Sequence, residues 1–72
     1  MPIAFAPEGR LLKVIKVLAD DKTKKHLGDL GITINATLTV LSSEGGTVIC
    51  SIKDGRLALD RSISTKIIVV EA

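Results

Sequence analysis

The residue types that most often carry chemistry are scarce in this sequence. It holds one histidine, His26, and one cysteine, Cys50, among 72 residues. The carboxylate of Asp29 is three positions from His26, but two ligands make a poor zinc site, which needs three or four. The sequence has no CxxC pair and no glycine-rich phosphate loop. It therefore predicts no metal site and no resident cofactor, and an enzyme is the function class it favours least.

The histidine and the cysteine each have an ordinary structural explanation. Cys50 alternates with Val48 and Ile52, a pattern that predicts a buried strand residue without a reactive role. His26 falls near the expected end of a helix, where a positive side chain suits the helix dipole. We expect His26 at the surface, where a partner could contact it.

Basic side chains are the better candidates for a binding role. One cluster is "KTKKH", with Lys22, Lys24, Lys25 and His26. The arginines that flank "LAL" are Arg56 and Arg61. The alternative reading is that the lysines form a solvated helix face, and that the arginines cap carbonyls or pair with Asp54 and Asp60.

The overall charge argues against a nucleic-acid partner. The formal net charge is only +2, and Phe5 is the single aromatic residue on which a base could stack. We therefore take the lysines and His26, with Arg56 second, as a protein-binding surface.

The first half of the chain predicts a strand followed by a short helix. Residues 10–18 alternate so that Leu12, Val14 and Leu18 share a face, and Lys16 breaks the alternation in a way that a bulge would correct. A helix should follow, capped by Asp20 or Asp21.

Two glycines lie near the end of that helix. Leu27 and Leu30 should face the core, and Gly31 should end the helix in the left-handed conformation, with Ile32 folding back onto Leu27. No helix cap explains the glycine at position 28, which lies inside the helix. We therefore expect a neighbouring strand to approach Gly28 closely.

The second half predicts short antiparallel strands. Residues 37–41 place Leu38 and Val40 inward and should be joined to 47–53 by a loop at 42–46. Asn35 should take a positive φ in the preceding turn. Asp54 and Gly55 predict a two-residue turn into 56–59. Residues 60–66 predict one helical turn, and 67–71 the last strand.

Length and composition predict one domain, 1–72, with one small core. One cysteine excludes an internal disulfide, and no signal peptide or membrane-spanning run is present. We expect a cytoplasmic protein that does not insert into a membrane.

Several segments in this order resemble the FeoA family, the small cytosolic component of the bacterial ferrous-iron uptake system. They are "HLGDLGIT", "TLTVL" and "GRLALDRSISTKIIV", and the opening "MPIAFAPEG" is similar to that family's first strand and glycine turn. The resemblance implies a mainly β fold, an SH3-like barrel of about five strands with one short inserted helix. It also implies a partner, the FeoB-type membrane permease with its cytosolic GTPase domain.

The resemblance carries no established metal motif. Its implied function is a non-enzymatic accessory or regulatory protein of ferrous-iron uptake, recruited to the membrane by its partner. The alternative is a small nucleic-acid-binding or metal-sensing regulatory barrel, since the same barrel occurs in metal-dependent repressors. Transient Fe²⁺ or Zn²⁺ association and the oligomeric state stay open.

Overall fold

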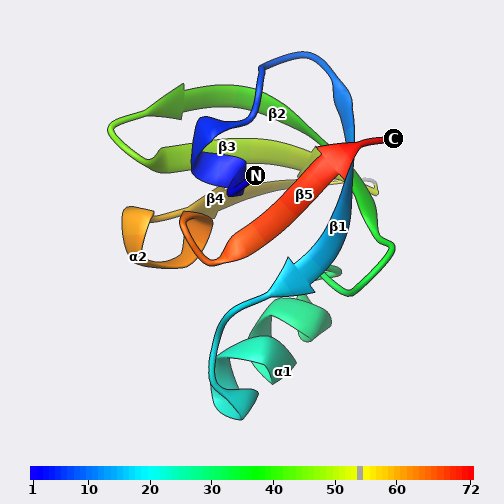
Figure 1. Ribbon diagram of the computed structural model, residues 1–72, viewed down its shortest axis with the longest axis vertical. Coiled ribbons are helices and arrows are strands. Elements are labelled where there is room, and N and C mark those ends of the chain that lie inside the picture. The colour runs from blue at the N-terminus through cyan, green and yellow to red at the C-terminus, as the bar shows by residue number, and fades with distance from the viewer. Residues whose placement is uncertain (54) are drawn as a thin grey trace.

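The computed structural model describes residues 1–53 and 55–72 and has a single five-stranded antiparallel sheet at its centre. The strands lie in the order β4-β3-β2-β1-β5 (Figure 1). Their bounds are β1 Leu11–Val17, β2 Thr37–Glu44, β3 Thr47–Ile52, β4 Gly55–Leu59 and β5 Ile67–Glu71. The helices are α1 Asp21–Asp29 and α2 Arg61–Ser64, and a 3-10 turn, η1, covers Ile3–Phe5. The prediction of a mainly β fold with a short helix inserted after the first long strand is confirmed.

The core lies on the concave side of the curled sheet, because alternate residues of each strand point there. Leu38 and Val40 of β2 point to this side, as do Val48 and Cys50 of the neighbouring strand β3, and each of the four is at most 2% exposed. The predicted inward residues of these two strands are confirmed. Ile3 of η1 closes the core and is fully buried. The opening segment Ile3–Phe5 forms a 3-10 turn, in place of the first strand that the resemblance implied for it.

Strand β1 contains the predicted bulge. Its pairing with β5 shifts register between Val14 and Lys16. A bulge adds one residue to the strand, so the buried face passes from Val14 to Val17 instead of continuing at every second position. Val17 is accordingly buried, Lys16 is exposed, and Leu18 is 50% exposed. The prediction that Leu18 lies on the core face is wrong.

Helix α1 begins and ends as its sequence predicts. The Asp20 carboxylate accepts a hydrogen bond of 2.8 Å from the Thr23 N–H. At the other end, Gly31 has φ +97°, its N–H donates to Gly28 O, and the Ile32 N–H donates to Leu27 O. These two bonds make a Schellman cap, the arrangement in which the residue after the glycine folds back over the last turn.

Two predictions for this helix are wrong. Leu27 is buried, but Leu30 is 40% exposed, so the helix is held to the core by one leucine. No strand backbone approaches Gly28: a Cβ placed there would meet only the Thr33 methyl group, at an ordinary 3.7 Å.

The turns agree with the sequence at Asn35 but differ from it at the two hairpins. Asn35 has φ +72°, as predicted. The hairpin loop consists of Gly45 and Gly46 alone, because β2 continues to Glu44. Both glycines have positive φ, which is the type I′ geometry that suits the twist of two-residue hairpins. The predicted turn at 54–55 is displaced by one residue: Lys53 is a turn residue with φ +52°, and Gly55 already belongs to β4, where it pairs with Ile52. Asp54 lies outside the described residues.

Among the described residues, no helix is both long and apolar enough to cross a membrane.

Candidate functional site

The predicted basic residues of α1 all reach solvent but do not share one face. Lys22, Lys24, Lys25 and His26 are exposed. Successive helical residues are rotated by about 100°, so Lys25 lies nearly opposite the buried Leu27, while Lys24 lies beside it. Lys25 therefore points away from the sheet, and Lys24 borders the contact between helix and sheet.

A groove runs beside Lys24 where α1 meets the end of β1. Its volume is about 330 Å³, and it is lined by Lys16, Val17, Lys24, Ile32, Thr33 and Ile34. Val17 and Ile32 are buried and form an aliphatic floor, whereas Ile34 is 53% exposed at the rim. Two lysines from different elements, Lys16 and Lys24, flank this floor. We call these six residues the lysine groove.

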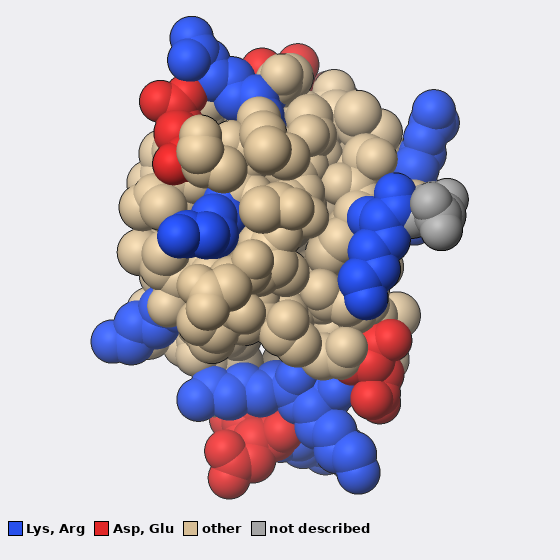
Figure 2. All heavy atoms as spheres, turned by 90° about the vertical axis from the view of Figure 1, so that its right-hand side faces the viewer, with Lys and Arg blue, Asp and Glu red and all other residues tan. Residues whose placement is uncertain are grey.

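The electrostatics of the helix are mixed rather than uniformly basic. Asp21 and Asp29 lie at its two ends, and Figure 2 shows acidic and basic side chains interspersed at the lower end of the molecule, where α1 lies. Above them is a broad uncharged surface. Hydrogen bonds from the Thr23 side chain and backbone N–H hold the pKa of Asp20 below its ordinary value. The surface at and above α1 therefore combines uncharged side chains with charges of both signs and is not a continuous cationic patch.

The arginine of the predicted surface lies elsewhere. Arg56 is exposed on β4, paired across the strands with Ser51, and it does not line the lysine groove. The structure therefore divides the predicted set. It brings Lys24 to the groove, leaves Lys22, Lys25 and His26 on the outer surface of α1, and places Arg56 on an edge strand.

Sequence reasoning missed most of the groove. From the sequence, Lys16 is only a break in alternation and Ile32 only a residue that folds back onto Leu27. Their meeting depends on the β1 bulge and on the Schellman cap, which together bring the ends of β1 and α1 against the 32–34 loop. The signal available in the sequence was an isoleucine, Ile34, in a turn that otherwise prefers polar residues.

The histidine and the cysteine are not brought together. Cys50 is fully buried in β3, and burial raises the pKa of its thiol, whereas His26 is exposed on α1. Across residues 1–53 and 55–72, no group of three or more His, Cys, Asp or Glu side chains is placed to hold a metal ion. The core reading of Cys50 is confirmed.

Comparison with known proteins gives the family. The chain matches the FeoA domain family over residues 1–71. It is 37% identical over 71 residues to "Putative Fe(2+) transport protein A" of Methanocaldococcus jannaschii, covering 99% of this chain and 87% of that protein.

Solved structures share the fold. A crystal structure of "Iron Uptake Regulatory Protein (FeoA)" superposes with a TM-score of 0.86 at 24% identity, covering 100% of this chain and 96% of that one. A "Manganese-dependent transcriptional repressor" superposes with a TM-score of 0.88 at 20% identity, covering all of this chain and 41% of the repressor. These likenesses concern the fold alone, and they confirm the predicted SH3-like architecture. The family match over residues 1–71 and the 37% identity to the Methanocaldococcus jannaschii protein establish that the chain belongs to the FeoA domain family.

Proposed function

We propose that this protein is an accessory component of ferrous-iron uptake that acts by binding a FeoB-type permease, without catalysis of its own. Membership of the FeoA domain family and the 37% identity to a relative named as an Fe(2+) transport protein support the transport role. The contact would be made from the cytoplasmic side, on the GTPase domain or the adjoining membrane region.

The observation that carries the proposal is the lysine groove. Its floor is aliphatic, formed by the buried Val17 and Ile32, and Ile34 at the rim is 53% exposed. An aliphatic groove with charged side chains at its rim is typical of protein-binding surfaces. The groove lies next to the predicted surface on α1, and Lys24 belongs to both.

The chemistry of the groove defines its partner surface. An aliphatic side chain of the permease would enter between Val17 and Ile34, and carboxylates beside it would meet Lys16 and Lys24. Charges at such a rim mainly set the association rate and the orientation of docking. Apolar burial on the floor supplies the affinity.

The test is calorimetric titration of the cognate permease's cytosolic domain into this protein, in nucleotide-free, GDP and GTP-analogue states. Saturable binding in at least one state is expected. Lys24→Glu should weaken binding by about tenfold or more, because it reverses charge at the groove.

The matched control is Lys25→Glu, the same charge reversal one residue along the same helix. Lys25 points away from the groove, so its reversal should weaken binding by about threefold or less. Equal losses from both variants would move the contact to the outer surface of α1. No binding in any nucleotide state, with both proteins shown to be folded, would contradict docking on this domain.

A further inference from the structure

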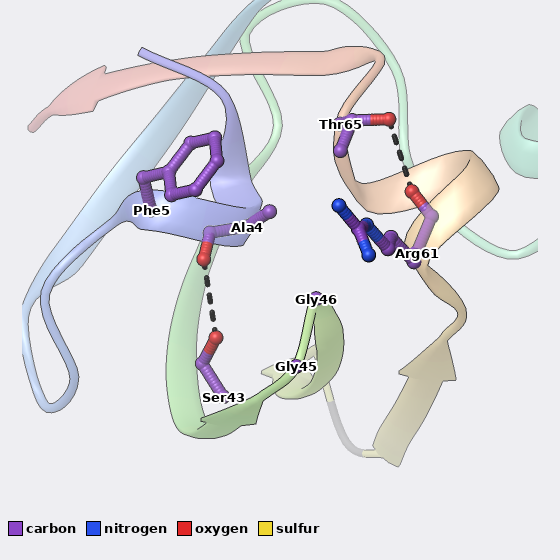
Figure 3. A pocket seen from close by; sticks show the side chains of 7 residues that line it. All are labelled: Ala4, Phe5, Ser43, Gly45, Gly46, Arg61 and Thr65. Carbon is purple, nitrogen blue, oxygen red and sulfur yellow. Dashed lines mark hydrogen bonds between the residues drawn. The ribbon is translucent and has the colours of Figure 1, made fainter.

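A second hollow lies away from α1, between η1, the β2–β3 hairpin and α2 (Figure 3). Its volume is about 380 Å³. It is lined by Ala4, Phe5, Ser43, Gly45, Gly46, Arg61 and Thr65. Figure 3 shows Phe5 on one side and Arg61 on the other, with the glycine turn between them. We call it the Phe5–Arg61 hollow.

Hydrogen bonds hold the backbone on both sides of Phe5. The Phe5 N–H donates to Pro2 O, and the Ser43 hydroxyl donates to the Ala4 carbonyl at 3.2 Å, tying η1 to β2. Ile3 points into the core from the same turn, so Phe5 is directed outward and is 76% exposed. One exposed apolar side chain is ordinary. This one matters because it lies across a hollow from a cation.

Arg61 is held from the other side. Its aliphatic stem lies directly over Gly46: a Cβ placed on that glycine would be 2.6 Å from Arg61 Cγ and 3.0 Å from Arg61 Cβ. The buried Ser64 hydroxyl donates to the Gly46 carbonyl, which fastens α2 to the hairpin. Thr65 Oγ1 donates to the Arg61 carbonyl at 2.9 Å. The stem and the backbone of Arg61 are therefore fixed, and its guanidinium is aimed at the hollow.

The charge of Arg61 is not neutralised within the described residues 1–53 and 55–72. The ion pair recorded there joins Arg10 to Glu71. The neighbouring Asp60 does not pair with Arg61, because its carboxylate accepts from the Ser62 hydroxyl at 2.7 Å and from the Ile63 N–H at 3.1 Å. These bonds hold the pKa of Asp60 low. Among residues 1–53 and 55–72, Arg61 forms no ion pair with Asp60 and is the only charged residue that lines the hollow.

We propose that the Phe5–Arg61 hollow binds a partner-protein segment in which a carboxylate adjoins an aromatic side chain. The carboxylate would accept two parallel hydrogen bonds from the guanidinium, and the ring would pack against Phe5 in an offset or edge-to-face arrangement. A segment fits better than a free small molecule, because sites for small molecules enclose most of the ligand, whereas both anchors here are exposed. The walls are tied before binding, so little ordering entropy is lost.

The test uses capped tetrapeptides and the amide NMR spectrum of the full chain. The probes are acetyl-Gly-Trp-Asp-Gly-amide and two variants of it, one with Asn in place of Asp and one with Ala in place of Trp. The same peptides with the two central residues in reverse order are tested in parallel. The acidic aromatic peptide should shift the amides of Phe5, Gly45, Gly46 and Arg61 saturably. Replacing Asp by Asn, or Trp by Ala, should weaken binding by about threefold to tenfold.

Variants separate the two anchors. Arg61→Gln should bring the affinities of the Asp and Asn peptides together, whereas Phe5→Ala should weaken both Trp peptides alike. Arg10→Gln is the matched control: it removes an arginine from an exposed ion pair outside the hollow and should leave peptide binding unchanged. Equal binding of the Asp and Asn peptides in both orders, or shifts that do not centre on the hollow, would overturn the proposal.

Discussion

The lysine groove and the Phe5–Arg61 hollow are similar in size but differ in how they are held together. The groove depends on α1, which is anchored to the core by one buried leucine, Leu27. In the hollow, hydrogen bonds from Ser43 and Ser64 tie the walls to one another, and the glycine turn forms part of the lining. The groove can therefore adjust to a partner by small movements of α1, whereas the hollow is a preformed site.

The largest effect should come from the single anchor of the groove. Leu27→Ala would leave a cavity and should lower the free energy of unfolding by about 2–5 kcal/mol. For a chain of this size, that is a large part of the total stability. Urea unfolding followed by circular dichroism measures it.

Leu30→Ala is the control for that prediction, since Leu30 is 40% exposed on the same helix. We expect a change of about 0.5 kcal/mol or less. Equal losses of unfolding free energy from the two leucine variants would contradict the anchoring of α1 by Leu27 alone.

A smaller but more local effect is expected at the hollow. Gly46→Ala puts a Cβ against the stem of Arg61 and a side chain at φ +89°. It should cost about 1–3 kcal/mol of stability, measured by the same urea unfolding. Gly45→Ala has a similar turn conformation, φ +59°, but meets nothing within 4 Å, so its cost should be smaller. A larger loss of stability from Gly45→Ala than from Gly46→Ala would mean that Arg61 does not pack on the hairpin.

The caps of the two helices should weaken together in acid. The pKa values of Asp20 and Asp60 are both lowered by the hydrogen bonds that their carboxylates accept, chiefly from Thr23 and Ser62 respectively. A lowered folded-state pKa means that the ionised caps stabilise the protein above the unfolded pKa, and that this contribution is lost as the pH falls through the folded value. The amide signals of Thr23 and Ile63 should therefore move together below pH 3.8, the ordinary value. Movement centred well above that pH would contradict the assignment of these caps.

The smallest effect concerns Cys50. Its thiol is fully buried, and burial raises its pKa. A thiol reagent at neutral pH should therefore react only as fast as the chain unfolds. Rapid reaction in the native protein would show that β3 opens locally.

Local pattern predicted most of the fold, because strand alternation, the Asp20 cap and the Gly31 cap each depend on residues that are close together in the chain. The misplacement of Leu18 arose because a bulge resets the alternation after it, and the sequence indicates a bulge without fixing its position. Leu30 was misplaced because helical spacing alone does not tell how deeply a helix is buried.

The sites were less predictable for a different reason. The lysine groove joins the end of β1 to α1 and the 32–34 loop, and the Phe5–Arg61 hollow joins η1 to the β2–β3 hairpin and α2. Neither juxtaposition leaves a local spacing that could be recognised. Lys24 is conspicuous because it belongs to a basic run, whereas for Arg61 the sequence offers a structural role as well, capping carbonyls or pairing with Asp54 and Asp60.

The most direct test of the account is to map the permease contact on the amide spectrum of this protein, using the unlabelled cytosolic domain of the cognate permease. We expect the perturbed amides to centre on Lys16, Val17, Lys24 and the 32–34 loop. Perturbation confined to β4 around Arg56, or to the outer surface of α1 around Lys25, would contradict the lysine groove as the docking site.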